Sequence, residues 1–137
     1  MELQLTGLQE TLQSLSSLNI SEQLENKALN KAGKSIQKAI IAEAPIDKRN
    51  PVDHASLHKN IKLKRPKDGE IIIHTGGAYH SHIIELGRSA GSTITKGGKK
   101  VTWGIINPNP FFSRGYEQSK AEALNALIDE IQRGLGL

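Results

Sequence analysis

Three residues in the middle of the chain have side chains of the kinds that bind metal ions. His80 and His82 are two positions apart, so a strand would place both imidazoles on one face, and Glu85 follows closely. His54 and His58 have the i, i+4 spacing that a helix places on one side. Neither set comes with the partners of a metallohydrolase motif, such as a second acidic cluster or His-Glu-x-x-His. We therefore expect ordinary surface or interface histidines and no bound metal, and a metal-dependent hydrolase is the least favoured alternative.

Other patterns that support catalysis are weak. The pairs Gly76-Gly77 and Gly97-Gly98 lack the spacing of a phosphate-binding loop, and we expect turns there. The acidic residues are few and scattered, which leaves little for paired-carboxylate chemistry. The absence of cysteine excludes disulfides, zinc ribbons and thiol catalysis. The sequence therefore predicts a protein that is not an enzyme and needs no cofactor.

The positive charge of the chain is concentrated in two short segments. Overall there are 18 basic and 14 acidic residues, a net charge of +4. Residues 46–68 hold seven basic and three acidic residues, and residues 88–104 hold four basic residues and no acidic one. Such clusters are usually solvated surface, but they are also typical of faces that contact a polyanion or an acidic partner. The candidate contact residues are Lys62, Lys64, Arg65, Lys67, Arg88, Lys96, Lys99 and Lys100.

Length and composition limit the class of protein. A chain of 137 residues suits one domain, residues 1–137, and can bury a core without metal or disulfide. Aromatic residues make up 4%, too few for a platform that stacks several bases. No apolar run approaches the ~20 residues needed to span a bilayer, and no secretory signal is recognisable at residues 1–5. We expect a soluble protein, made inside the cell and not associated with a membrane.

The first half of the chain predicts mainly helix. Residues 2–6 alternate as in a half-buried strand, and leucines at helical spacing predict a short helix over 8–15. A long helix should run from about 22 to 43, with Asn19 or Ser21 as its N-cap and Ala44-Pro45 at its end. Its apolar stripe is rich in alanine and glycine, which permits close approach of a packing partner. We expect a loop over 46–56.

The second half predicts strands and then a helix. Lys67-Asp68-Gly69 is a hairpin turn signal between strands ending near 64 and starting near 70. Residues 79–86 fit a strand or a short helix equally well, and 87–100 predict a long, mobile basic loop. A last strand covers 100–106, and a final helix opens with Asn109 as N-cap and Pro110 as its first residue, closing at Gly134. The fold class is therefore α+β, a mostly antiparallel sheet of about four strands packed against two long helices.

Several blocks in this order resemble the tail-component family of long-tailed bacteriophages and prophages, which includes head–tail joining and tail-completion (neck) proteins. The similarity covers nearly the whole chain. The blocks are Thr6-Gly7-Leu8, Ala44-Pro45-Ile46-Asp47, Ala55-Ser56-Leu57-His58-Lys59-Asn60-Ile61, His80-Ser81-His82-Ile83-Ile84-Glu85-Leu86-Gly87 and Asn109-Pro110-Phe111-Phe112.

The resemblance implies a structural protein of the virion, without catalysis, that is assembled in the cytoplasm of the bacterial host. It would form a ring with copies of itself at the head–tail interface or the tail end, and genomic DNA would pass through the lumen. Its partners would be head-connector and tail-tube proteins, with sequence-nonspecific contact to DNA in the channel. The alternative is a small sequence-nonspecific nucleic-acid-binding module that uses the segments 46–68 and 88–104.

Overall fold

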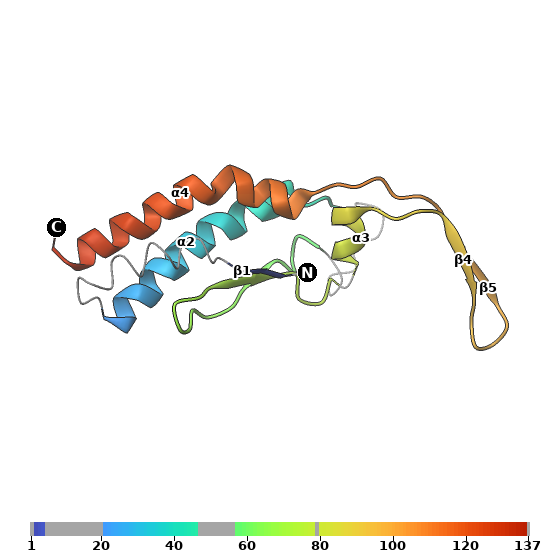
Figure 1. The fold of residues 1–137 in the computed structure, drawn as a ribbon, viewed down its shortest axis with the longest axis horizontal. Helices are drawn as coiled ribbons and strands as arrows, with labels where there is room; N and C mark the ends of the chain where they lie inside the picture. Colours follow the sequence, from blue (N-terminus) through green and yellow to red (C-terminus); the bar gives the residue numbers. More distant parts are fainter. Residues whose placement is uncertain (1, 5–20, 47–56, 79, 137) are drawn as a thin grey trace.

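The computed structural model describes residues 2–4, 21–46, 57–78 and 80–136, and it has the predicted α+β architecture. Two long helices pack against each other, one of them also packs against a three-stranded sheet, and a separate two-stranded hairpin projects away from them (Figure 1). The helix predicted over 8–15 and all but the first residue of the loop predicted over 46–56 lie outside the described residues. The elements are β1 (Glu2–Gln4), α2 (Glu22–Glu43), β2 (Lys62–Leu63), β3 (Ile72–His74), α3 (Ser81–Leu86), β4 (Gly91–Ile94), β5 (Lys100–Trp103) and α4 (Phe111–Gly134).

The long helix α2 begins and ends where its sequence predicts. The hydroxyl of Ser21 accepts a hydrogen bond from the Leu24 amide (3.2 Å), which satisfies one free donor of the first turn. Glu22 and Glu25 place negative charge at the positive end of the helix dipole. The helix stops at Ala44, whose extended backbone is the conformation favoured before a proline.

Close contacts place α2 in the middle of the molecule, between α4 and the sheet. On one side α2 crosses α4, where a Cβ added to Gly115 would lie 2.7 Å from the Cα atom of Ile40. On the other side a Cβ added to Gly33 would lie 2.5 Å from the Cδ1 atom of Ile71 in the hairpin that leads into β3. Both glycines are therefore required by the distance between neighbouring elements, and Gly33 belongs to the alanine- and glycine-rich stripe of α2 that predicts such an approach.

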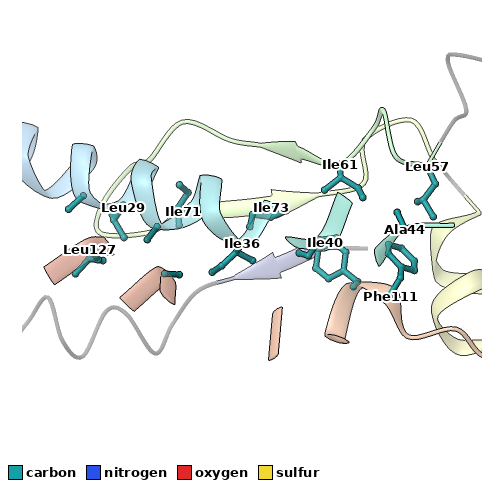
Figure 2. Close-up of a cluster of buried hydrophobic side chains, with 14 of the residues drawn as sticks. Leu29, Ile36, Ile40, Ala44, Leu57, Ile61, Ile71, Ile73, Phe111 and Leu127 are labelled. Atoms are coloured by element: carbon teal, nitrogen blue, oxygen red, sulfur yellow. The ribbon is translucent and has the colours of Figure 1, made fainter. Parts of the chain in front are cut away.

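The core follows α2 along its length (Figure 2). Aliphatic side chains of α2 meet those of the sheet on one side and those of α4 on the other. Phe111 and Phe112 close the end near α3, with ring centroids 6.1 Å apart in an edge-to-face arrangement. The buried apolar residues are Ala28, Leu29, Ala32, Ile36, Ile40, Ala44, Leu57, Ile61, Ile71, Ile73, Ala78, Phe111, Phe112, Ala123, Leu127 and Ile131.

A buried carboxylate ties the two long helices together at their other end. Glu130 of α4 is 4% exposed. Its two oxygens accept from the ammonium groups of Lys27 (3.0 Å) and Lys31 (3.1 Å), both on α2. These two hydrogen bonds hold the pKa of Glu130 below its usual value, and the bond from Lys27 has the larger effect.

The three-stranded sheet is antiparallel, with the order β1-β3-β2. Strands β2 and β3 are joined by the predicted turn, in which Asp68 (φ 51°) and Gly69 (φ 75°) both have left-handed backbones. Lys67 and Glu70 exchange two backbone hydrogen bonds of 3.0 Å across it. This is the two-residue turn whose twist matches that of the flanking strands, and Asp-Gly is one of its preferred sequences.

The second sheet corrects the loop predicted over 87–100. Residues 91–94 form strand β4, which pairs with β5 in the register Gly91↔Trp103 to Ile94↔Lys100. The β-branched residues between Ser92 and Thr95 favour a strand, and the following Gly-Gly pair supplies the turn. The Gly98 amide donates to the Thr95 carbonyl (2.9 Å), with Gly98 at φ 80°. The strand predicted over 100–106 is confirmed over Lys100–Trp103, and the mobility of this segment stays a prediction.

Among the described residues, no helix is both long enough and apolar enough to cross a membrane.

Candidate functional site

The feature that stands apart from the helical body is the ribbon of residues 88–106, which we call the arm. At its base Arg88 and Ile106 exchange two backbone hydrogen bonds of 3.0 and 2.9 Å. The pairing of Arg88 with Ile106 continues in register to Gly91 with Trp103, so the arm is one antiparallel ribbon. Figure 1 shows it extending away from the helices. None of its residues is buried.

The base of the arm is fixed to the body by Glu85 of α3, a side chain that is 6% exposed. Its carboxylate accepts hydrogen bonds from the backbone amides of Phe112 (2.9 Å) and Ser113 (3.1 Å) and from the Ser113 hydroxyl (2.6 Å). These amides are the free donors of the first turn of α4, and the negative charge lies at the positive end of that helix dipole. Glu85 therefore caps α4 from a distance of 27 residues in the sequence.

The predicted cap of α4 is therefore wrong. Pro110 occupies the N-cap position and makes no side-chain cap, and α4 begins at Phe111. The Asn109 carboxamide oxygen instead accepts from the guanidinium of Arg114 (2.9 Å), and the Asn109 amide donates to the Ile84 carbonyl (2.8 Å). With Glu85 as its cap, α4 is locked to α3, and the two chain segments of the arm leave the body from a fixed position.

The arm combines basic and apolar side chains, most of them exposed. Its basic residues are Arg88, Lys96, Lys99 and Lys100, and it holds no acidic residue. The rest of the chain has 14 basic and 14 acidic residues, so the arm accounts for the whole net charge.

The apolar residues of the arm are large and well exposed. Ile94 is 71% exposed, Ile105 72% and Val101 40%. Trp103 is half-buried, because its ring lies over Gly91 and beneath the guanidinium of Arg88, whose Cζ atom is 5.9 Å from the ring centroid. A surface of this composition is better suited to contact with a partner than to contact with water.

The other predicted basic residues do not join the arm. Lys62, Lys64, Arg65 and Lys67 are all exposed, and they lie on β2 and the strand-like segment that follows it. This hairpin runs along α2, and its turn reaches Glu25 near the beginning of that helix, where a Cβ on Gly69 would lie 3.0 Å from the carboxylate. Figure 1 shows the β2–β3 turn and the arm pointing in opposite directions. The eight candidate residues therefore form two separate surfaces.

The metal-site alternative finds no support in the geometry. His80 is the N-cap residue of α3 and His82 lies in its first turn, so the two are not alternate residues of a strand. Both oxygens of Glu85 are occupied by the first turn of α4. No group of three or more metal-binding side chains occurs in the part of the chain that the structure describes, and His54 lies outside it.

From the sequence we expect no Gly-x-Ser-x-Gly elbow that supports a nucleophile, although one serine lies in a segment that matches the letters of this motif. Residues 87–91 read Gly-Arg-Ser-Ala-Gly, which matches the letters of the Gly-x-Ser-x-Gly nucleophile motif. That motif requires a strand, a sharp turn and a helix in this order, whereas here Gly87 ends α3 and Gly91 begins β4. Gly87 serves packing instead: at φ 74°, a Cβ would lie 2.6 Å from the Ile106 carbonyl oxygen.

Comparison with known families identifies the type of protein to which this architecture belongs. Residues 7–87, more than half of the chain, match the model of the HK97-gp10-like family, whose description reads "Bacteriophage HK97-gp10, putative tail-component". The chain belongs to this family of bacteriophage tail components. The resemblance predicted from the sequence is therefore confirmed, and with it a structural role in the phage tail. Searches of the curated proteins and of the solved structures found no match.

The matched region of the tail component includes α2, β2, β3 and α3 and stops at Gly87. The arm and α4 follow it, so the surface described above is attached directly after the family region. Glu85, the residue that fixes the base of the arm, lies inside the match. Sequence reasoning missed its role, and the available signal was an acidic residue within the apolar stretch Ile83-Ile84-Glu85-Leu86.

Proposed function

We propose that this tail component is a head–tail joining or tail-completion protein, which forms a ring at the head-proximal end of the tail through which DNA passes. The observation that carries the proposal is the arm, a ribbon with no buried residue that is held rigidly at its base. A lone subunit gains nothing from such an extension, whereas a subunit of an assembly can use it to reach its neighbour. Family membership supports the structural role.

A ring requires two different surfaces on each subunit. Closed cyclic assemblies larger than dimers use heterologous contacts, in which one face of a subunit meets a different face of the next. The arm provides one such face and the helical body the other. Head-connector and tail-tube proteins would then contact the two flat sides of the ring.

The lysines of the arm suit a lumen that holds DNA. Lys96, Lys99 and Lys100 lie at its outer end, and the arm itself contains no acidic residue. Contacts of lysine with phosphate carry no base information and weaken steeply with salt. Such contacts allow DNA to pass without being held at one sequence.

The same charge favours one other function, a sequence-nonspecific nucleic-acid-binding module. This alternative predicts that the purified chain retards any duplex in a gel-shift assay at low salt and that binding is lost as salt increases. A chain that binds no duplex at low salt would exclude it. Weak binding agrees with both functions, so the assay serves to remove the alternative and not to establish the ring.

Deleting the gene from its phage tests the proposal. We expect unjoined heads and tails in electron micrographs of the lysate, and recovery of joined, infectious particles when the wild-type gene is supplied from a plasmid. Supplying the Glu117→Ala variant, which removes only an exposed carboxylate, provides the matched control and should also restore infectivity. Normal infectious particles in the absence of the gene would contradict the proposed function.

A further inference from the structure

Most charged side chains of the two long helices are compensated within the chain. Glu22 and Glu25 lie in the first turn of α2, at the positive end of its dipole. The ion pairs are Glu43 with Arg114, Glu117 with Lys120, and Glu130 with Lys27, Lys31 and Arg133. The remaining charges are exposed and form no ion pair with any residue that the structure describes: Lys34 and Lys38 of α2, and Glu122 and Asp129 of α4.

Lys34 and Lys38 form one side of α2, which we call the lysine face. They are four residues apart, so they are neighbours on the helix surface, about 6 Å apart along its axis. Lys34 is two residues from the buried Ala32 and from the buried Ile36, which at about 100° per residue places it on the opposite side of the helix. Lys38 has the same relation to Ile36 and Ile40. The lysine face therefore points away from the core, which explains why neither lysine pairs with α4 of the same chain.

Glu122 and Asp129 form one side of α4, which we call the acidic face. They are seven residues apart, which is about two turns, so they lie on the same side of the helix and about 10 Å apart along its axis. Asn125 lies between them on this side and is exposed and uncharged. Because lysine carries its ammonium group on a flexible four-carbon stem, the two lysines of the lysine face can spread to the wider spacing of these carboxylates.

We propose that the lysine face of one subunit docks against the acidic face of the next copy of this chain. The proposal rests on the ring proposed above and adds a contact between helices to the reach of the arm. The two faces lie on different helices and carry opposite charges, as a heterologous contact between identical subunits requires. In the free chain all four charges lack an ion-pair partner among the described residues, and this contact compensates all of them.

A second copy accounts for both faces, whereas DNA accounts for one. The phosphate backbone attracts Lys34 and Lys38, but it repels Glu122 and Asp129. A copy of this chain offers the complementary face to each of them. Complementary charges of this kind select the partner and fix the register of a contact more than they add affinity. The lysine and acidic faces would therefore set how neighbouring subunits align.

Exchanging the charges tests this contact in the phage from which the gene has been deleted. One plasmid supplies the chain with Lys34→Glu and Lys38→Glu, and a second plasmid supplies the chain with Glu122→Lys and Asp129→Lys. Each variant alone places like charges against each other, so we expect the titre of infectious particles to fall about tenfold or more. When both are supplied, each chain meets opposite charge on the other, and the titre should return to within about twofold of the wild-type value.

Two further chains provide the controls. A single chain that carries all four substitutions has the wild-type net charge and exchanged faces, and it should restore the titre. The chain with Arg65→Glu and Lys67→Glu changes the net charge as much as the lysine variant does, but in the exposed segment that follows β2. Adding the Glu122→Lys, Asp129→Lys chain to it should bring no gain in titre. Circular dichroism should show the wild-type fold for every variant, because all the substituted side chains are exposed.

The outcomes separate this inference from the proposed function. Loss of titre with each variant alone and recovery with both together support the docking contact. Full titre from either variant alone overturns the contact and leaves the proposed ring standing. Loss without recovery, in chains that fold, means that the two faces have different partners and also overturns the contact. An equal gain with the Arg65→Glu, Lys67→Glu chain does so too, because net charge alone would then explain the recovery. Normal infectious particles without the gene overturn the proposed function and the docking contact together.

Discussion

Replacing Glu85 by alanine should destabilise the protein far more than removal of a surface carboxylate does. The substitution leaves the Phe112 amide without a partner in a buried position, and it removes the acceptor of both Ser113 donors. A buried unsatisfied donor costs about 1–3 kcal/mol. Loss of a helix cap costs about 0.5–2 kcal/mol. Because Ser113 is exposed and water can replace its contacts, we expect a total loss of about 3 kcal/mol.

Urea unfolding followed by far-UV circular dichroism measures this loss. With a slope of about 1.5 kcal/mol per M, the midpoint should fall by about 2 M. Glu117→Ala is the matched control, because that carboxylate is 61% exposed and its ion pair is with the exposed Lys120, so its removal should cost less than about 0.5 kcal/mol. A midpoint for Glu85→Ala equal to that of Glu117→Ala would refute the assignment of Glu85 as the cap of α4.

Three further results are expected from the purified chain. Gly115→Ala should lower the free energy of unfolding by about 1–3 kcal/mol, because the Cβ of the new alanine would meet the backbone of Ile40. Gly104 has open space around it, so Gly104→Ala should be neutral in the same urea titration. Because the pKa of Glu130 is lowered in the folded protein, its ionised carboxylate contributes to the free energy of unfolding above about pH 4.5, and this contribution disappears as the pH falls through the folded-state pKa. Glu130→Gln should therefore flatten the acid side of the curve of stability against pH. An unchanged curve would contradict this. Trp103 is the only tryptophan, so its fluorescence should shift to shorter wavelength when the chain self-associates, and an unshifted spectrum would mean that the base of the arm stays exposed to water.

The elements that sequence predicted well are those whose signals are local. Helix α2 has a serine cap at one end and an Ala-Pro stop at the other, and its bounds follow from these residues. The turn between β2 and β3 follows from Asp68 and Gly69, because few residue pairs accept two left-handed backbones in succession. The overall α+β class then follows from two long apolar stripes and several short strands.

Long-range pairing lies beyond local signals. Strand β1 pairs with β3 across about 70 positions, and nothing in its three residues specifies that partner. Residues 87–100, which include β4, were interpreted as a loop because they are rich in glycine, although their β-branched residues are strand formers. The cap of α4 was assigned to Asn109, the nearest suitable side chain, whereas the structure uses a carboxylate from α3.

For the candidate site, too, the sequence identified the residues but not their arrangement in space. The eight basic residues were identified because positive charge is concentrated in two segments, and all eight are exposed in the structure. Their separation into two surfaces depends on the direction in which each hairpin leaves the body, which spacing does not reveal (Figure 1). The exposed isoleucines of the arm were missed because a solvent-facing apolar residue is recognised only when the fold shows which residues remain uncovered.

The central claim is that this tail component sits as a ring where the tail meets the head, and its position in the particle can be observed directly. A small affinity tag on the C-terminus, which follows α4, can be labelled with gold and located by electron microscopy of purified infectious particles. The account predicts label at a single site per particle, at the head-proximal end of the tail. Label spread along the tail tube, label at the distal tip, or particles without the tagged chain would contradict it.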